Sequence, residues 1–133
     1  MRVVFDTNVL FSALTAKGFC EEVVDEAVGE CVLIWSNPLR QELEAVLARR
    51  HEIGPATRAA LDAYVDICEF VEPEPLPARV CRDKDDDVAL ATAVAGRAQI
   101  VVTGDEDLLA LKKFGDVRIL SPRQFLEVLD QRM

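Results

Sequence analysis

The chain has 133 residues, half of them hydrophobic, which suits a single domain spanning residues 1–133 with one core. Its formal net charge of −9 argues against a protein that coats nucleic acid through its overall field, but does not exclude a metal-using nuclease. No apolar run approaches the ~20 residues that span a bilayer, and no segment resembles a signal peptide. We therefore expect a cytoplasmic protein with no membrane partner.

The elements predicted in chain order alternate between strands and helices. Short apolar runs predict strands at 2–5, 31–35, 70–71, 99–103 and 117–120. Helices are expected at 9–14, 19–28, 37–51, 55–67, 85–96, 107–113 and from 122 onward. This alternation predicts an α/β protein with a mostly parallel sheet covered on both faces.

Two local signals refine this outline. Ser36 precedes Pro38 at the start of a helix, so its side chain is expected to cap that helix. Residues 72–79 carry three prolines and predict an extended loop.

The four cysteines and the single histidine do not favour a zinc site. No Cys-x-x-Cys pair occurs, and His51 lies in a charged stretch. We expect free and mostly buried thiols in a reducing compartment.

Two aspartates stand directly after predicted strands. Asp6 follows Val3–Phe5, and Asp105 follows the segment 100–104. Ligands of parallel sheets bind beyond the carboxyl ends of the strands, so the two acids share a crevice if their strands are neighbours. Crowded carboxylates need a cation to stay ionised, and oxygen-only ligands indicate Mg²⁺ or Mn²⁺.

Glu42 is a third candidate, on the helix that follows residue 36. It lies roughly 85° from the centre of the apolar stripe of that helix, so it flanks the core face. The stripe consists of Leu39, Leu43, Val46 and Leu47.

The run Asp85-Asp86-Asp87 opens another helix and supplies the fourth candidate. Asp87 shares an i, i+3, i+4, i+7 stripe with Leu90, Ala91 and Val94, so we interpret it as the acid aimed along the core-facing side. A cation is the simplest partner for a carboxylate placed there. Asp83 or Asp85 is better explained as a helix cap or a supporting acid.

Each of these acids also has an ordinary explanation as a helix cap or a solvated side chain. The joint pattern is harder to explain that way, because four strand or helix ends supply carboxylates and the predicted topology would bring them together. In so acidic a chain, local basic residues are the candidates for holding phosphate. They are Arg49, Arg50, Arg58, Arg79, Arg82, Lys84, Lys112 and Lys113.

In this order, Asp6-Thr7-Asn8, Glu42, Asp87–Ala93 and Thr103–Leu108 resemble a PIN domain over essentially the whole chain. The chain is most similar to the bacterial and archaeal branch of toxin–antitoxin PIN proteins related to VapC toxins. The resemblance implies a three-layer α/β/α sandwich with a parallel sheet in the order 3-2-1-4-5. It also implies a Mg²⁺- or Mn²⁺-dependent endoribonuclease.

By position, the resemblance makes Asp6, Glu42, Asp87 and Asp105 the catalytic and metal-binding acids. Asn8 and Thr103 match its polar, substrate-binding neighbours, and Asp107 and Asp85 are secondary candidates. The partners implied are an RNA substrate, a small antitoxin protein and a second copy of the chain in a homodimer. We expect a metal-activated water, with no covalent nucleophile, to attack the phosphodiester.

Two alternatives keep this fold: a catalytically weak module that binds RNA or protein, and a structure-specific DNA nuclease. Other acid-cluster α/β classes fit less well. A phosphatase of the haloacid dehalogenase type needs Asp-x-Asp after the first strand, but residue 8 is Asn. A phospho-receiver needs a lysine after its last core strand, where Ser121-Pro122 stands instead.

Overall fold

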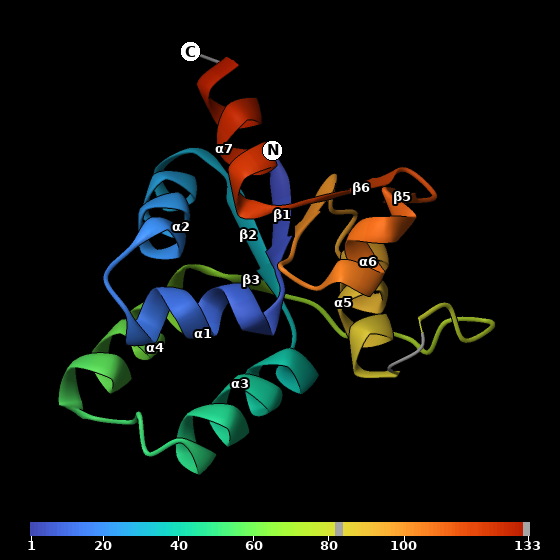
Figure 1. The fold of residues 1–133 in the computed structure, drawn as a ribbon. Coiled ribbons are helices and arrows are strands. Elements are labelled where there is room, and N and C mark those ends of the chain that lie inside the picture. The colour runs from blue at the N-terminus through green and yellow to red at the C-terminus, as the bar shows by residue number, and fades with distance from the viewer. Residues whose placement is uncertain (82–83, 132–133) are drawn as a thin grey trace.

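The structure, a computed structural model, describes residues 1–81 and 84–131, and of residues 84 and 85 the backbone only. Its centre is a sheet in the order β3-β2-β1-β4-β6-β5 (Figure 1). The strands are β1 (Arg2–Phe5), β2 (Val32–Trp35), β3 (Glu69–Phe70), β4 (Ile100–Val102), β5 (Lys113–Phe114) and β6 (Val117–Leu120). The helices are α1 (Thr7–Thr15), α2 (Phe19–Glu30), α3 (Asn37–Arg49), α4 (Pro55–Ile67), α5 (Lys84–Ala95), α6 (Glu106–Leu111) and α7 (Pro122–Gln131).

The predicted strand order 3-2-1-4-5 is confirmed, with β6 as the fifth predicted strand, and these strands are parallel throughout. One strand was not predicted. β5 is two residues long and pairs antiparallel with β6. The turn between them contains Gly115 at φ 58°, a conformation that glycine adopts without strain. Two residues carry too little apolar pattern to be recognised as a strand in the sequence.

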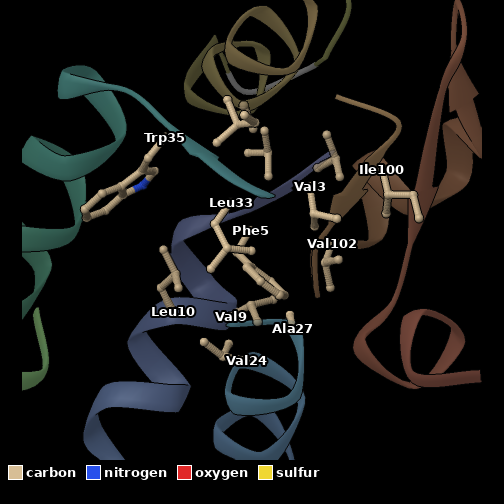
Figure 2. Close-up of a cluster of buried hydrophobic side chains, with 14 of the residues drawn as sticks. Val3, Phe5, Val9, Leu10, Val24, Ala27, Leu33, Trp35, Ile100 and Val102 are labelled. Atoms are coloured by element: carbon tan, nitrogen blue, oxygen red, sulfur yellow. The ribbon is translucent and has the colours of Figure 1, made fainter. Parts of the chain in front are cut away.

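Helices cover both faces of the sheet, so the predicted three-layer α/β/α sandwich is confirmed (Figure 1). On one face, α1, α2 and α7 bury alternate strand residues such as Val3, Phe5 and Leu33 (Figure 2). On the other face, α5 and α6 form a smaller apolar cluster with β6. Its buried members are Cys81, Leu90, Leu108 and Ile119.

The expected side-chain cap by Ser36 is wrong. Ser36 precedes α3, but its hydroxyl makes no capping bond and lies 2.9 Å from the hydroxyl of Thr92 on α5. Both residues are fully buried. Thr92 donates to the Val88 carbonyl, so Ser36 is the donor in this pair. The hydroxyl thus ties α3 to α5 because the end of β2 aims it at the α5 face.

The pairing of β1 with β4 fixes where the chain leaves the sheet. Phe5 is the partner of Val102, and the Asp6 N–H donates to the Val102 carbonyl at 2.9 Å. The next residues, Asp6 and Thr103, therefore emerge side by side at the carboxyl edge. Within the described residues, no helix is long and apolar enough to cross a membrane.

Gly96, at the end of α5, tests how tightly this helix packs on the sheet, and Gly29 in α2 serves as its control. A Cβ at Gly96 would overlap Cγ2 of the fully buried Ile34, whereas a Cβ at Gly29 in α2 meets nothing within 4 Å. We expect Gly96→Ala to lower the free energy of unfolding by about 1–3 kcal/mol, because a β-branched core residue must move. The matched Gly29→Ala should raise it by about 0.5–1 kcal/mol through helix propensity.

Urea unfolding followed by circular dichroism measures both changes. A Gly96→Ala variant as stable as the wild type would show that the end of α5 does not pack tightly on β2.

Candidate functional site

Asp6 is a buried carboxylate at the carboxyl end of β1, with only 4% of its surface exposed. Its Oδ1 accepts the Thr7 N–H at 2.9 Å. Its Oδ2 accepts the Thr103 hydroxyl at 2.8 Å and the Asn8 side-chain amide at 3.1 Å. Burial raises the pKa of Asp6 and the nearby charge of Asp105 adds to that rise, while these three donors lower it. The net rise means that its negative charge is incompletely compensated.

Asn8 and Thr103 hold the two strand ends together. The Asn8 Oδ1 accepts the Gly104 N–H at 2.9 Å, and the Thr103 hydroxyl accepts the Asp105 N–H at 3.0 Å. Each of these side chains therefore bonds both to Asp6 and to the turn that carries Asp105. Their contacts are those of residues that fix the position of the acids.

Asp105 is the N-cap of α6. Its Oδ1 accepts the N–H groups of Asp107 and Leu108 at 2.8 and 3.1 Å. Asp105 lies close enough for its charge to raise the pKa of Asp6. Asp107 contributes its backbone N–H to this cap, and its side chain is exposed.

A hollow at this edge of the sheet, here called the acidic hollow, collects carboxylates from three elements. Its lining includes Asp6 after β1, Thr7 on α1, Glu42 on α3 and Asp86 on α5. Glu42 comes within reach because α3 begins directly after β2 and buries Leu39 and Leu43, which flank it in the sequence. Glu42 thus lies beside the core face of α3, as the sequence predicts.

The structure places Asp87 differently from the sequence interpretation. Its two oxygens accept backbone N–H groups of the preceding loop: Oδ1 from Cys81 at 2.7 Å and Oδ2 from Val80 at 3.0 Å. Burial acts to raise the pKa of Asp87, but these two bonds, the Cys81 thiol and the charge of Arg79 together lower it. Asp87 therefore fastens the loop to α5, and its neighbour Asp86 is the acid that lines the hollow.

The helical stripe used to select Asp87 explains the difference. Leu90 and Ala91 are buried as that stripe predicts, but Val94 is 52% exposed, so the stripe does not face the core along its whole length. At the first turn, the loop ending at Cys81 covers the side of α5 that carries Asp87. Consecutive helical residues point about 100° apart, so Asp86 faces another direction.

Cys81 shows how closely the remaining acids approach each other. Burial raises the pKa of its thiol, and the hydrogen bond and charge of Asp87 and the charges of Asp86 and Asp105 raise it further, to about 12. Acids from α5 and from the N-cap of α6 therefore both raise the pKa of this thiol. The position of Cys81 before a charged run predicts that it is the likeliest of the four cysteines to be exposed, and this prediction is wrong, because Cys81 is the buried one.

These residues fit a divalent cation. Thr7 lines the acidic hollow, and its buried hydroxyl has no hydrogen-bond partner in the part of the chain that the structure describes. The raised pKa of Asp6 indicates a carboxylate that positive charge would stabilise. Among the described side chains, no three acidic, thiol or imidazole groups converge tightly enough to hold an ion together.

Of the predicted site residues, Asp6, Asn8 and Glu42 line the hollow, while Asp105 and Thr103 adjoin it through Asp6. Asp83 and the side chain of Asp85 lie outside the described residues. Sequence reasoning passed over Asp86.

Comparisons with known proteins agree on the fold. A family model described as PIN domain matches residues 2–107. The uncharacterized protein MJ1680 of Methanocaldococcus jannaschii is 26% identical to this chain, over 98% of this chain and 93% of the relative. A chain in the crystal structure of VapBC2 from Rickettsia felis, bound to a DNA fragment from their promoter, is 12% identical. It superposes with a TM-score of 0.62 over 90% of this chain and 97% of that one, a likeness that shows the fold.

The contacts of Asp87 generate a stability prediction. We expect Asp87→Asn to lower the free energy of unfolding at pH 7 by about 1–2 kcal/mol, because an amide cannot accept both loop N–H groups. Since folding lowers the pKa of Asp87, its stabilisation is present above the unfolded-state pKa of about 3.9. This stabilisation is lost as pH falls through the lowered folded-state pKa. The difference in free energy of unfolding between the wild type and Asp87→Asn should therefore narrow at low pH.

Urea titrations at pH 7 and in the acid range measure this gap. Asp25→Asn on the exposed side of α2 serves as the control and should change stability by less than about 0.5 kcal/mol. Equal stability of Asp87→Asn and the control at pH 7 would contradict the assigned role.

Proposed function

The chain belongs to the PIN domain family, and from that premise we propose that it is a Mg²⁺- or Mn²⁺-dependent endoribonuclease that hydrolyses RNA phosphodiester bonds. One observation carries the proposal. Asp6, Glu42 and Asp86 come from three separate elements to line one hollow, and Asp105 lies beside Asp6. Oxygen ligands of this kind suit hard divalent cations.

The proposed acid set is Asp6, Glu42, Asp86 and Asp105. Asp86 is preferred to Asp87 because it lines the hollow together with Asp6 and Glu42, whereas Asp87 bonds to two N–H groups of the preceding loop. Asn8 and Thr103 are proposed as positioning residues, because their polar atoms bond to Asp6 and to the turn after β4. Asp107 and Asp85 stay secondary candidates.

A bound Mg²⁺ or Mn²⁺ would lower the pKa of a coordinated water and neutralise charge that develops on the phosphate. The chain's own residues supply position. Three donors hold Asp6 in one orientation, and the cap of α6 holds Asp105. Glu42, on α3, is suited to orient the attacking water. The hydrolysis needs no covalent nucleophile, and the sole histidine of the chain, His51, is exposed beyond the end of α3.

We further propose that the protein is the cytoplasmic toxin of a toxin–antitoxin pair, inhibited by a small antitoxin, and that it forms a homodimer. The sequence resemblance to VapC-related proteins supports this, as does the similar fold of a chain from the two-component VapBC2 assembly. Expression with any small gene found next to this one, followed by co-purification and light scattering, tests both partners.

Removing single carboxylates tests the catalytic assignment. We expect Asp86→Asn and Asp105→Asn each to reduce Mn²⁺-dependent cleavage of single-stranded RNA by on the order of 100-fold or more, since each removes a negative charge from the cation site. Asp105→Asn can keep its cap through Oδ1, which makes it the cleaner variant. Cleavage rates are measured on labelled RNA with an EDTA control.

Glu106→Gln, an exposed neighbour of Asp105, is the matched control and should retain full activity. Thermal unfolding confirms that each variant folds. Unchanged cleavage by both aspartate variants would refute the site. Loss of activity in folded Asp87→Asn but not in Asp86→Asn would return the role to Asp87. Preferential cleavage of flapped DNA would favour the structure-specific DNA nuclease instead.

Metal binding has a readout that does not depend on activity. A ligand at 100 times its Kd stabilises the folded state by about 2.7 kcal/mol, so saturating Mn²⁺ should raise the melting temperature of the wild type by several degrees. The rise should be largely lost in an Asp86→Asn/Asp105→Asn double variant. Differential scanning fluorimetry at constant ionic strength measures it. An equal rise in both proteins would place the ion elsewhere.

A further inference from the structure

Two arginines near the acid cluster are held over aromatic rings. The Arg50 guanidinium lies 5.5 Å from the ring centroid of Phe11, and the Arg123 guanidinium lies 5.1 Å from that of Phe19. Arg50 follows α3 and Arg123 lies in the first turn of α7, so distant parts of the chain bring them to the rings of α1 and α2.

Arg50 lines one hollow at the site, and Arg123 follows a residue that lines another. Arg50 and Phe11 belong to the lining of the acidic hollow, together with Asp6, Glu42 and Asp86. A second hollow, here called the Asp105 hollow, is lined by Asn8, Ser12, Cys20, Gly104, Asp105 and Pro122. Pro122 directly precedes Arg123, and Cys20 directly follows Phe19. The two hollows share Asn8 and Ser12, so these residues form the ridge between them.

The charges of these arginines are not used within the protein. Arg2, Arg40 and Arg58 form ion pairs with acidic side chains. Arg50 and Arg123 form no ion pair with any residue that the structure describes, although the chain carries 24 acidic residues and Arg50 lines the acidic hollow. Both side chains belong to exposed residues.

The aromatic contact has a chemical consequence. A guanidinium stacked on a ring keeps the N–H donors along its edge free for a planar or tetrahedral anion. The ring also restricts where the charge can move, which lowers the entropy lost when an anion binds. Backbone phosphate is the anion that a nuclease site receives, and arginine pairs with it through two parallel N–H bonds.

We propose that Arg50 and Arg123 bind backbone phosphates of a single RNA strand, on the two sides of the phosphate that the acid cluster hydrolyses. The strand crosses the ridge of Asn8 and Ser12 from one hollow to the other. A single strand fits because its backbone turns freely enough to reach both hollows, unlike a stiff duplex. This inference rests on the proposed nuclease function and assigns its substrate-binding residues.

The chain offers matched controls for both arginines. Arg49 is exposed on the last turn of α3, next to Arg50, and contacts no ring. Arg118 lies on β6 opposite Ile100, the first residue of β4, and therefore at the other end of the sheet. Replacing any of these arginines with glutamine removes the same charge, so the variants differ only in where the charge is removed.

The experiment measures binding of a short single-stranded RNA by fluorescence anisotropy over a range of salt concentrations. An Asp105→Asn background with Mg²⁺ present slows cleavage during the measurement. We expect Arg50→Gln and Arg123→Gln each to weaken binding by roughly tenfold. Each should reduce the slope of log K against log salt by about 0.7, the value for one phosphate contact on a single strand. Arg49→Gln and Arg118→Gln should change neither quantity appreciably.

In the otherwise wild-type chain, Arg50→Gln and Arg123→Gln should raise KM for RNA cleavage and largely retain kcat. Affinities and salt slopes equal to those of the controls would overturn the inference, as would a chain that binds no RNA. Equal binding of duplex RNA would overturn the single-strand assignment. Arginine-dependent binding without cleavage by the wild-type chain would support the inference and refute the nuclease proposal.

Discussion

The buried negative charge of Asp6 is the constraint on which the rest of the site depends. Burial of a carboxylate is costly, and three hydrogen bonds from Thr7, Asn8 and Thr103 offset only part of the cost, since the pKa of Asp6 stays raised. Asp105 adds repulsion from a neighbouring strand end. Among the described residues no basic side chain bonds to this carboxylate, which is why a divalent cation is proposed to complete the site.

The parallel sheet produces this arrangement through its register. Because β1 pairs with β4 so that Phe5 faces Val102, the chain delivers Asp6 and Thr103 to adjacent positions at the carboxyl edge. The Thr103 hydroxyl then bonds to Asp6 and also accepts the Asp105 N–H, which couples the pairing of two strands to the geometry of two acids. A change of one residue in register would reverse the facing of β4 and separate them.

Features set by local sequence were predictable, and those set by distant packing were not. Asp6, Asp105 and their polar neighbours follow strands, so the strand prediction located them. The choice between Asp86 and Asp87 depends on the loop ending at Cys81, whose N–H groups occupy Asp87. The side-chain partner of Ser36 likewise depends on distant packing, because it is Thr92 of α5, 56 positions further along the chain. Arg50 was one of several basic candidates, whereas the role inferred for Arg123 depends on a contact with Phe19 across the molecule.

The acidity of the chain and its inferred affinity for RNA are compatible because the two act over different ranges. The net charge of −9 sets the field at a distance, which salt at physiological concentration screens beyond about 8 Å. Binding at the site depends on charges within contact distance. An arginine free to move beside Asp6 and Glu42 would pair with them and compete with a divalent cation. Phe11 and Phe19 each offer an arginine a favourable alternative position, so positive charge can stand beside the carboxylates without neutralising them.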